Sequence, residues 1–178
     1  LIGVMALACM IPEGAILDWA AVYLQREMGA SLAVAGWGFG ACAGTMAVMR
    51  FLGDGIRRRY GAVRTLRVSA VIAMAGLAVA ALAPTPPVAL VGFGLAGIGI
   101  ANMVPIAFSA AGNVPGLAQG IGLSVVTTMG YSGILLAPGS IGFLAEQTSF
   151  AVIYGGLSLL LLVPLLMSRL ARTADFGG

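Results

Sequence analysis

The stretch Arg50–Arg67, RFLGDGIRRRYGAVRTLR, lies between two long apolar segments and holds six of the nine cationic residues of the chain. Lys and Arg near the end of a membrane span are retained on the cytoplasmic side during insertion. We therefore predict a short cytoplasmic loop here, and the simplest alternative is a charge run that only anchors that loop. The six cations are Arg50, Arg57, Arg58, Arg59, Arg64 and Arg67.

The remaining composition is that of a membrane protein. Of the 178 residues, 60% are hydrophobic and only 8% are charged, whereas soluble domains have roughly 25% charged residues. No charged residue occurs from Val68 to Ala145. Because a spanning helix needs about 20 apolar residues, the chain has room for six. Membrane β-barrels have strands that alternate polar and apolar residues, and that alternation is absent.

Charge and residue types exclude several functional classes. The net charge of +3 comes from arginine alone, and positive-inside topology accounts for it, so we predict no nucleic-acid partner. The chain has no histidine, the commonest metal ligand. Cys9 and Cys42 lack the spacing of a metal site or a disulfide. We predict no metal, no cofactor and no enzyme activity, because no nucleophile lies beside a base.

Gly, Pro and Asn rather than charge divide the apolar sequence into predicted helices. Gly29 and Pro84–Pro87 are helix stop signals, and Ser31 is a predicted N-cap. Arg169 and Arg172 follow the last apolar segment and place the C-terminus inside. The predicted spans are about Leu1–Leu24, Leu32–Leu52, Ala62–Ala83, Val88–Ala111, Gln119–Leu144 and Phe150–Met167.

The six predicted spans form two similar triplets. The starts of the last three lie 87 or 88 positions after those of the first three. Such triplets enter the membrane from opposite sides, so we predict an all-α membrane protein with six transmembrane helices in a 3+3 inverted repeat. We expect the second and fifth spans to pack tightly, the second through Gly36, Gly40 and Gly44. We expect the third and sixth to face lipid, and the first and fourth to line a wet region.

A polar pattern inside the arginine-rich stretch indicates a conformational latch. A carboxylate is stabilised beside a helix N-terminus and an arginine fork, so Asp54 and its arginine neighbours can hold a closed state and release it in an open one. Gly53, Gly55 and Gly61 allow the backbone to turn sharply. We expect Arg50 to pair with Asp54 or a neighbouring carboxylate. The pattern R-x-x-G-D-x-x-x-x-R-[FY]-G consists of Arg50, Gly53, Asp54, Arg59, Tyr60 and Gly61.

This pattern resembles the signature loop between the eighth and ninth helices of the major facilitator superfamily of transporters. The resemblance covers the whole chain and implies that residues 1–178 are the C-terminal six-helix half of such a transporter, with the N-terminal half of the same protein as partner. It also implies that Asp54 meets a helix of that other half. The pattern departs at Ala62 and Val63, where two basic residues often follow the glycine, which weakens the expected latch. The first span is similar to that of bacterial inner-membrane permeases of the fucose-permease type.

Glu13 is the leading candidate for a functional side chain. It lies near the middle of the first span, where a carboxylate costs about 2.5 to 3.5 kcal/mol by insertion scales. We expect it to line a cavity and to bind a proton or a polar group of the substrate. The alternative is a structural hydrogen bond to a neighbouring helix.

Further polar residues are weaker candidates for contact with the substrate. Asp18, with Trp19 beside it, is either a gate or substrate contact, or a residue near the membrane interface. Asn102 can bind substrate or the kinked backbone that follows it. Thr127 and Tyr131 are weaker still, because such hydroxyls often bond to local carbonyls.

The sequence as a whole predicts a secondary active transporter that works by alternating access. We expect it to be proton-coupled and to move a small polar or amphipathic solute. We expect it to lie in the bacterial inner membrane, in contact with lipid, with its C-terminus inside. The alternative is a non-transporting or channel-like membrane subunit, whose spans complete a pore by oligomerising.

Overall fold

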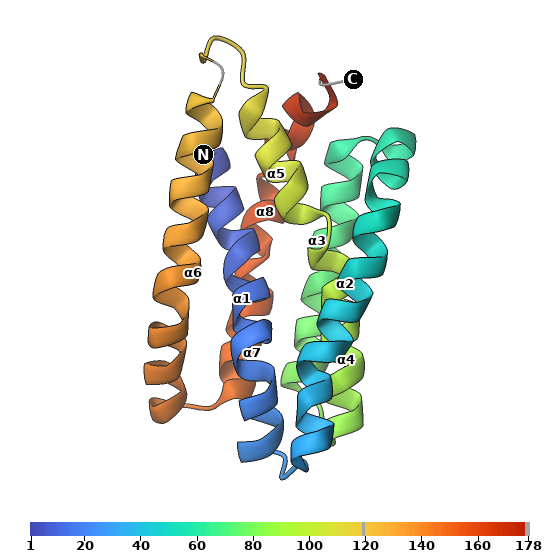
Figure 1. The fold of residues 1–178 in the computed structure, drawn as a ribbon, viewed down its shortest axis with the longest axis vertical. Coiled ribbons are helices and arrows are strands. Elements are labelled where there is room, and N and C mark those ends of the chain that lie inside the picture. The colour runs from blue at the N-terminus through green and yellow to red at the C-terminus, as the bar shows by residue number, and fades with distance from the viewer. Residues whose placement is uncertain (119, 177–178) are drawn as a thin grey trace.

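Hydrocarbon offers no partner for backbone N–H and C=O groups, so long apolar runs are stable in a membrane when those groups pair within helices. The computed structural model describes residues 1–118 and 120–176; nearly all of them are helical, and no strand occurs in that part of the chain (Figure 1). The elements are α1 (Ile2–Arg26), α2 (Leu32–Tyr60), α3 (Ala62–Ala81), α4 (Pro86–Ile100), α5 (Met103–Gly112), α6 (Ile121–Gln147), α7 (Phe150–Leu160), α8 (Leu162–Leu166) and the 3₁₀ segment η1 (Ser168–Phe176).

The helices run up and down along one bundle (Figure 1). Five stretches are long and apolar enough to cross a membrane, and one of them joins α4 and α5 as Pro86–Gly112. Phe150–Leu166 and Ser168–Asp175 pass the same test together, although they meet at 53°. With that bent pair taken as one span, the bundle has the six passes that the sequence predicts. The 3+3 inverted repeat stays a prediction.

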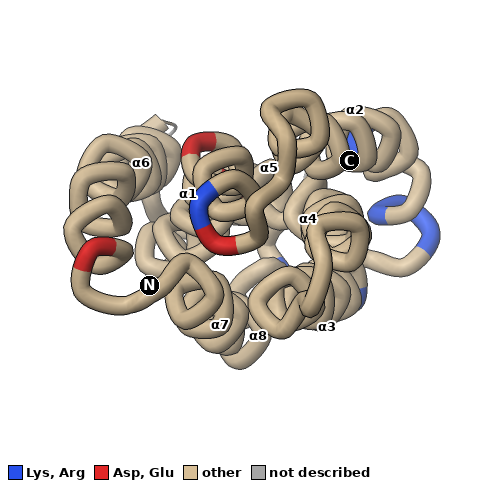
Figure 2. Tube along the Cα trace, turned by 90° about the horizontal axis from the view of Figure 1, so that it is seen from below, with Lys and Arg blue, Asp and Glu red and all other residues tan. Residues whose placement is uncertain are grey.

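Helix α1 lies between the two sides of the bundle. Seen along the long axis, α6 lies on one side of α1, whereas α2, α3 and α4 lie on its other side (Figure 2). Charged residues are few in this view. An aromatic cluster joins α1, α4 and α7 through Tyr23, Phe93, Phe150 and Tyr154, with ring centroids 5.1 to 6.3 Å apart. Both tyrosine hydroxyls donate to backbone carbonyls, at 2.8 and 3.2 Å, and these bonds tie α1 to α3 and α7.

The predicted turn and cap residues lie at helix ends. Gly29 has a φ of +64° just after α1, and Ser31 Oγ accepts a backbone N–H at 3.4 Å at the start of α2. Pro86 begins α4, which suits proline because the first N–H groups of a helix have no intrahelical partner to lose. The predicted start of the fifth span at Gln119 lies outside the described residues, and α6 begins at Ile121.

The prediction of a loop between the second and third spans is wrong, because this stretch is helical on both sides of Gly61. Helix α2 continues to Tyr60 and α3 begins at Ala62, so Gly61, with a φ of +78°, is the interruption. Gly53 and Gly55, two predicted turn residues, lie inside α2. Arginine is a good helix former, and cations near a helix C-terminus are stabilised by its dipole. The polar end of this segment therefore stays helical beyond the apolar span.

Helices α2 and α6, which we expect from the sequence to pack most tightly, are the least buried spans. In the most apolar segment of each, 22% is buried, against 61% for the span of α4 and α5. A Cβ atom at Gly36 or Gly44 would meet no described atom within 4 Å, whereas Gly38 lies against Ala20 and Leu24 of α1. Within the described chain the side of α2 that meets α1 is the one that carries Gly38, and close packing through Gly36, Gly40 and Gly44 stays a prediction.

Glycine does bring two other helices into close contact. A Cβ atom at Gly76, Gly92 or Gly99 would overlap the backbone of the facing helix, in each case between α3 and α4. Backbones approach this closely only where side chains are minimal. Helix α3 therefore buries one side against α4, and Val71, away from that side, is exposed.

Candidate functional site

Glu13 forms an ion pair with Arg50 that joins α1 to α2. Arg50 Nη2 donates to Glu13 Oε1 at 2.9 Å. Among residues 1–118 and 120–176 it is the one ion pair with a nitrogen-to-oxygen distance within 4 Å. The carboxylate that Arg50 binds is thus Glu13 on the neighbouring helix and not Asp54, which is nearer in sequence.

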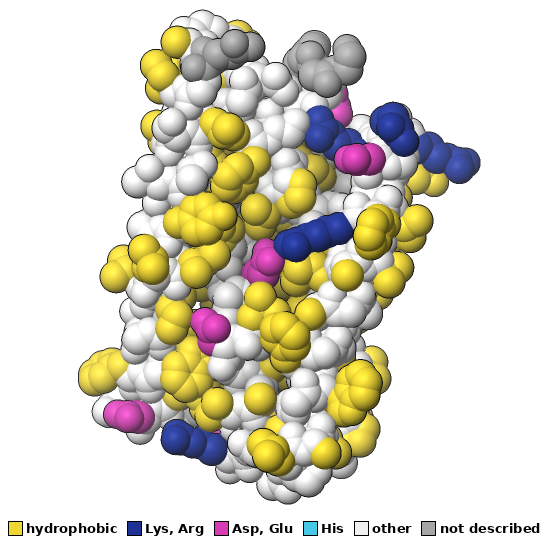
Figure 3. Space-filling view, in the orientation of Figure 1, with side chains coloured by type: hydrophobic (Ala, Val, Ile, Leu, Met, Phe, Trp, Pro, Cys, Tyr) yellow, Lys and Arg dark blue, Asp and Glu magenta, His cyan; other side chains and the backbone are white. Residues whose placement is uncertain are grey.

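The pair lies in largely apolar surroundings. Glu13 is near the middle of the 25-residue α1, and its side chain is 18% exposed, against 48% for Arg50. On the face in Figure 3, a basic and an acidic side chain touch near mid-height, with hydrophobic side chains around them. Water screens charges less where it is partly excluded, so this attraction is stronger than on a wet surface. Neutralising either group would leave the other charge poorly solvated.

Asp18 and Trp19 follow Glu13 on α1 but have different surroundings. Asp18 is exposed. The Trp19 ring packs at a tilt of 34° against the ring of Phe150, with centroids 5.5 Å apart, and a Cβ atom at Gly142 would lie 3.1 Å from the indole. Its Nε1 is buried and has no hydrogen-bond partner in the described part of the chain. Packing against α6 and α7 explains the position of the Trp19 ring. The indole N–H can still donate a hydrogen bond to a polar group.

Asn102 lies between α4 and α5 and is 7% exposed. Its side chain lies against Gly53 of α2, where a Cβ atom would overlap Asn102 Oδ1. Gly53 is therefore required for a close contact rather than for a turn. The sequence pattern identifies this glycine but not the reason for it, because the two residues are far apart in the chain.

Thr127 and Tyr131 lie on α6, the helix beside α1. Thr127 is half-buried and Tyr131 is 53% exposed. No hydrogen bond among the described residues links either hydroxyl to Glu13, Asp18 or Asn102. The structure therefore joins Glu13 directly to Arg50, and it provides no comparable link for the candidates on α6.

The arginine-rich ends of α2 and α3 bind the C-terminal segment η1. Arg57 Nη2 donates to Ser109 Oγ at 2.9 Å and to the carbonyl of Ala174. Arg67 Nε donates to Ser168 Oγ at 2.8 Å. Two of the clustered arginines thus hold the chain terminus in place, a structural role that sequence reasoning missed.

The first turn of α3 is capped from the far end of the chain. The backbone N–H of Ala62 donates to Asp175 Oδ1 at 2.8 Å. A carboxylate at a helix N-terminus is stabilised by the free N–H groups and by the helix dipole. The sequence gives no signal for this cap, because its donor and acceptor are 113 positions apart.

The other predicted latch residues lie at the surface of the same end. Asp54 and Arg59 are exposed, and the Arg59 guanidinium lies 5.5 Å from the centre of the Tyr60 ring. Within the ranges that the structure describes, neither Asp54 nor Arg59 has an ion-pair partner within 4 Å. Both are accessible to another protein segment, and the latch role of Arg50, Gly53, Asp54, Arg59 and Gly61 stays a prediction.

The chemistry of the site is that of one ion pair with a few polar groups. The described residues contain no group of three or more His, Cys, Asp or Glu side chains that could hold a metal ion. Cys9 and Cys42 are buried free thiols. Such a site suits the binding of a proton or a polar solute.

Comparison with known proteins gives one family. The family model described as Major Facilitator Superfamily matches residues 2–175. An uncharacterized MFS-type transporter of Yersinia pestis is 37% identical over 161 residues, which are 90% of this chain and 42% of the relative. An uncharacterized transporter of Sinorhizobium fredii is 33% identical over 86% of this chain and 41% of the relative. The membrane protein MosC of Rhizobium meliloti is 35% identical over 81% of this chain and 35% of its own length.

The chain spans less than half the length of these relatives. Among solved structures, a peptide transporter POT in complex with sulfate matches 99% of this chain and 38% of its own, with a TM-score of 0.83 and 17% identity. A mutant of that transporter in complex with alafosfalin matches with the same TM-score. At this identity the likeness concerns the fold.

Proposed function

Since the chain belongs to the major facilitator superfamily, we propose that it is one half of a secondary transporter that moves a small polar or amphipathic solute by alternating access, coupled to protons. Membership and the all-α fold of a transporter half, both predicted from the sequence, are confirmed. Two of the three relatives are named as transporters, which agrees with a transporter rather than an enzyme or a channel-like subunit. The similarity to fucose-permease-type proteins stays a prediction.

The observation that carries the proton-coupling proposal is the ion pair of Glu13 with Arg50. A carboxylate in apolar surroundings is favoured either paired with a cation or protonated. Uptake of a proton by Glu13 removes the attraction that holds Arg50, and α2 is then free to move relative to α1. Proton binding and a change of conformation are linked through this one contact.

The low burial of α2 and α6 supports the proposal that the other half of the transporter is the partner. These two helices flank α1 (Figure 1), and 22% of the most apolar segment of each is buried. We assign the other half to this side of the bundle, where Glu13 and Arg50 would lie between the two halves. Asp18, the indole N–H of Trp19 and Tyr131 are proposed contacts of the solute.

The arginine distribution supports a location in the bacterial cytoplasmic membrane with the C-terminus inside. Arginines gather where α2 ends, α3 begins and η1 lies, and the hydrogen bonds described above join these three segments. By the positive-inside rule this end faces the cytoplasm. The arginines concerned are Arg57, Arg58, Arg59, Arg64, Arg67, Arg169 and Arg172.

Substitution of Glu13 tests the coupling. A solute is first identified by comparing the uptake of candidate compounds in cells with and without the complete transporter. In proteoliposomes, we expect Glu13→Gln to abolish the acceleration of uptake by an imposed pH gradient, because glutamine cannot release a proton. Exchange of labelled for unlabelled solute, which requires no net proton movement, should persist.

Glu146→Gln is the matched control, because Glu146 is an exposed carboxylate at the end of α6. It should leave both assays unchanged. If uptake by Glu13→Gln still responds fully to the pH gradient, Glu13 is not the coupling residue.

A further inference from the structure

The fourth predicted span is interrupted at Ala101 and Asn102. Helix α4 ends at Ile100 and α5 begins at Met103. Pro105 explains the interruption, because proline has no N–H to donate and its ring conflicts with the carbonyl four residues earlier in a continuous helix. A few residues at the ends of two elements can act as a hinge by absorbing a change of backbone angles. The ten-residue α5 is therefore joined to α4 by a hinge.

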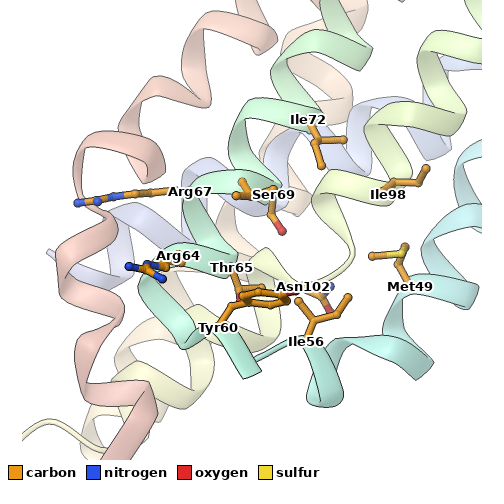
Figure 4. A pocket seen from close by; sticks show the side chains of 11 residues that line it. Met49, Ile56, Tyr60, Arg64, Thr65, Arg67, Ser69, Ile72, Ile98 and Asn102 are labelled. Atoms are coloured by element: carbon orange, nitrogen blue, oxygen red, sulfur yellow. The ribbon is translucent and has the colours of Figure 1, made fainter. Parts of the chain in front are cut away.

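Space lies beside this hinge. An apolar pocket of about 430 Å³ is formed by α2, α3 and the end of α4, and Asn102 is one of its lining residues (Figure 4). Its other lining residues include Met49 of α2 and Ile98 of α4. Densely packed interiors resist movement, and a pocket removes that resistance on one side. On this side the hinge can move without first displacing a packed neighbour.

The far end of α5 is held by α2 and η1 through hydrogen bonds. Thr173 Oγ1 of η1 donates to the carbonyl of Ala110 at 2.9 Å. Arg57 of α2 donates to Ser109 Oγ at 2.9 Å and to the Ala174 carbonyl of η1. Figure 1 shows the C-terminal segment next to α5 at this end of the bundle. One arginine thus joins α2, α5 and η1.

The segment η1 is also fixed to α3. Asp175 caps the first turn of α3, and Ser168 Oγ accepts a hydrogen bond from Arg67. Ser168, Ala171 and Ala174 have no exposed surface, so η1 is packed into the bundle rather than lying loosely on it. It therefore connects α5 to α2 and α3.

We propose that η1 is a clamp that holds α5 in its present position, and that a movement of α2 releases it. Arg57 lies seven positions after Arg50, on the same side of α2. A movement of α2 that breaks the ion pair of Glu13 with Arg50 therefore also pulls Arg57 away from α5 and η1, and α5 can then turn at its hinge. This inference rests on the proposed function, because it makes release of the clamp a consequence of proton uptake by Glu13.

Distance measurement by electron paramagnetic resonance tests the clamp in the complete protein in detergent. Spin labels are attached at Gly112→Cys, at the end of α5, and at Val71→Cys, an exposed position of α3, with the other cysteines replaced by alanine. A Cβ atom at Gly112 meets no described atom within 4 Å, so the label fits. Thr173→Val removes a hydroxyl but keeps the volume of the side chain. We expect it to increase the population at a changed distance about two- to ten-fold, the effect of losing one hydrogen bond.

Glu13→Gln, which resembles the protonated carboxylate, should increase the same population through α2. Two control variants should match the unmodified protein: Thr173→Ser, which keeps the hydroxyl, and Arg172→Gln, which removes an exposed charge of η1. An unchanged distance distribution in Thr173→Val, or an equal change in Arg172→Gln, would overturn the clamp. An unchanged distribution in Glu13→Gln would overturn its release by α2. The measurement needs no solute, so a failure of the clamp is distinguished from a failure of the protein to transport.

Discussion

At the scale of single residues, the proposed mechanism gives Arg50 two ways to lose its partner: Glu13 takes up a proton, or α1 and α2 move apart. Either event leaves a guanidinium that is already 48% exposed free to bind an anionic or polar group of a solute. Both events break the same contact. In the proposed mechanism the pair therefore links proton uptake, solute binding and helix movement.

The pair predicts a stability effect that depends on both residues. We expect Arg50→Gln to lower the thermal stability of the complete protein in detergent more than the double substitution of Glu13→Gln with Arg50→Gln. The single change leaves a mostly buried carboxylate without its cation, whereas the double change leaves two neutral amides. Coupling of about 0.5 to 3 kcal/mol between the sites is expected. Arg58→Gln, at an exposed position, controls for loss of one positive charge, and strictly additive effects would contradict the pair.

Sequence reasoning could find Glu13 but not its partner. A carboxylate inside an apolar span is costly and therefore conspicuous. Its pairing with Arg50 depends on how α1 and α2 align side by side, which no local spacing encodes. The same holds for Gly53, whose pattern is local but whose contact with Asn102 is made only in the folded bundle.

At the scale of helices, contact between backbones determines where glycine is required. Gly76 on α3 lies so close to Gly92 and Ala96 of α4 that a Cβ atom would overlap their backbone atoms. Backbone atoms cannot move aside as the end of a long side chain can. Glycines with the same conformation but no neighbour, such as Gly55, have no such requirement.

Alanine substitution distinguishes these two kinds of glycine. We expect Gly76→Ala to lower the free energy of unfolding by about 1 to 3 kcal/mol, because α3 and α4 must move apart to accept the methyl group. Gly55→Ala should be neutral or stabilising by up to about 1 kcal/mol, since alanine favours a helix. Thermal unfolding of the complete protein in one detergent measures both. Equal shifts for the two variants would mean that the close approach of α3 and α4 is not tight.

Helix boundaries were predictable where a local residue causes them. Gly29 and Ser31 act within a few residues of the turn that they form, so their patterns were sufficient. The arginine-rich end of α2 was not predictable as helix, because polarity marks the end of the apolar span and not the end of the helix. The sequence also could not predict which side of α2 packs against α1, since glycine spacing is compatible with either side.

At the scale of the whole molecule, composition was enough to identify a helical membrane protein with up to six passes. It was not enough to predict which spans are buried, because burial depends on the order in which the helices lie around the bundle. The described bundle leaves α2 and α6 mostly exposed on either side of α1. In the proposed complete transporter the second half covers this side, and the ion pair then lies where the two halves meet.

Accumulation of solute against its gradient tests the central claim most directly. The complete protein in sealed proteoliposomes, given a solute that it transports and a pH gradient, should raise the internal solute concentration above the external one. A protonophore should return it to equilibrium. If the internal concentration never exceeds the external one, and the pH gradient and the protonophore have no effect, the protein is not a proton-coupled transporter.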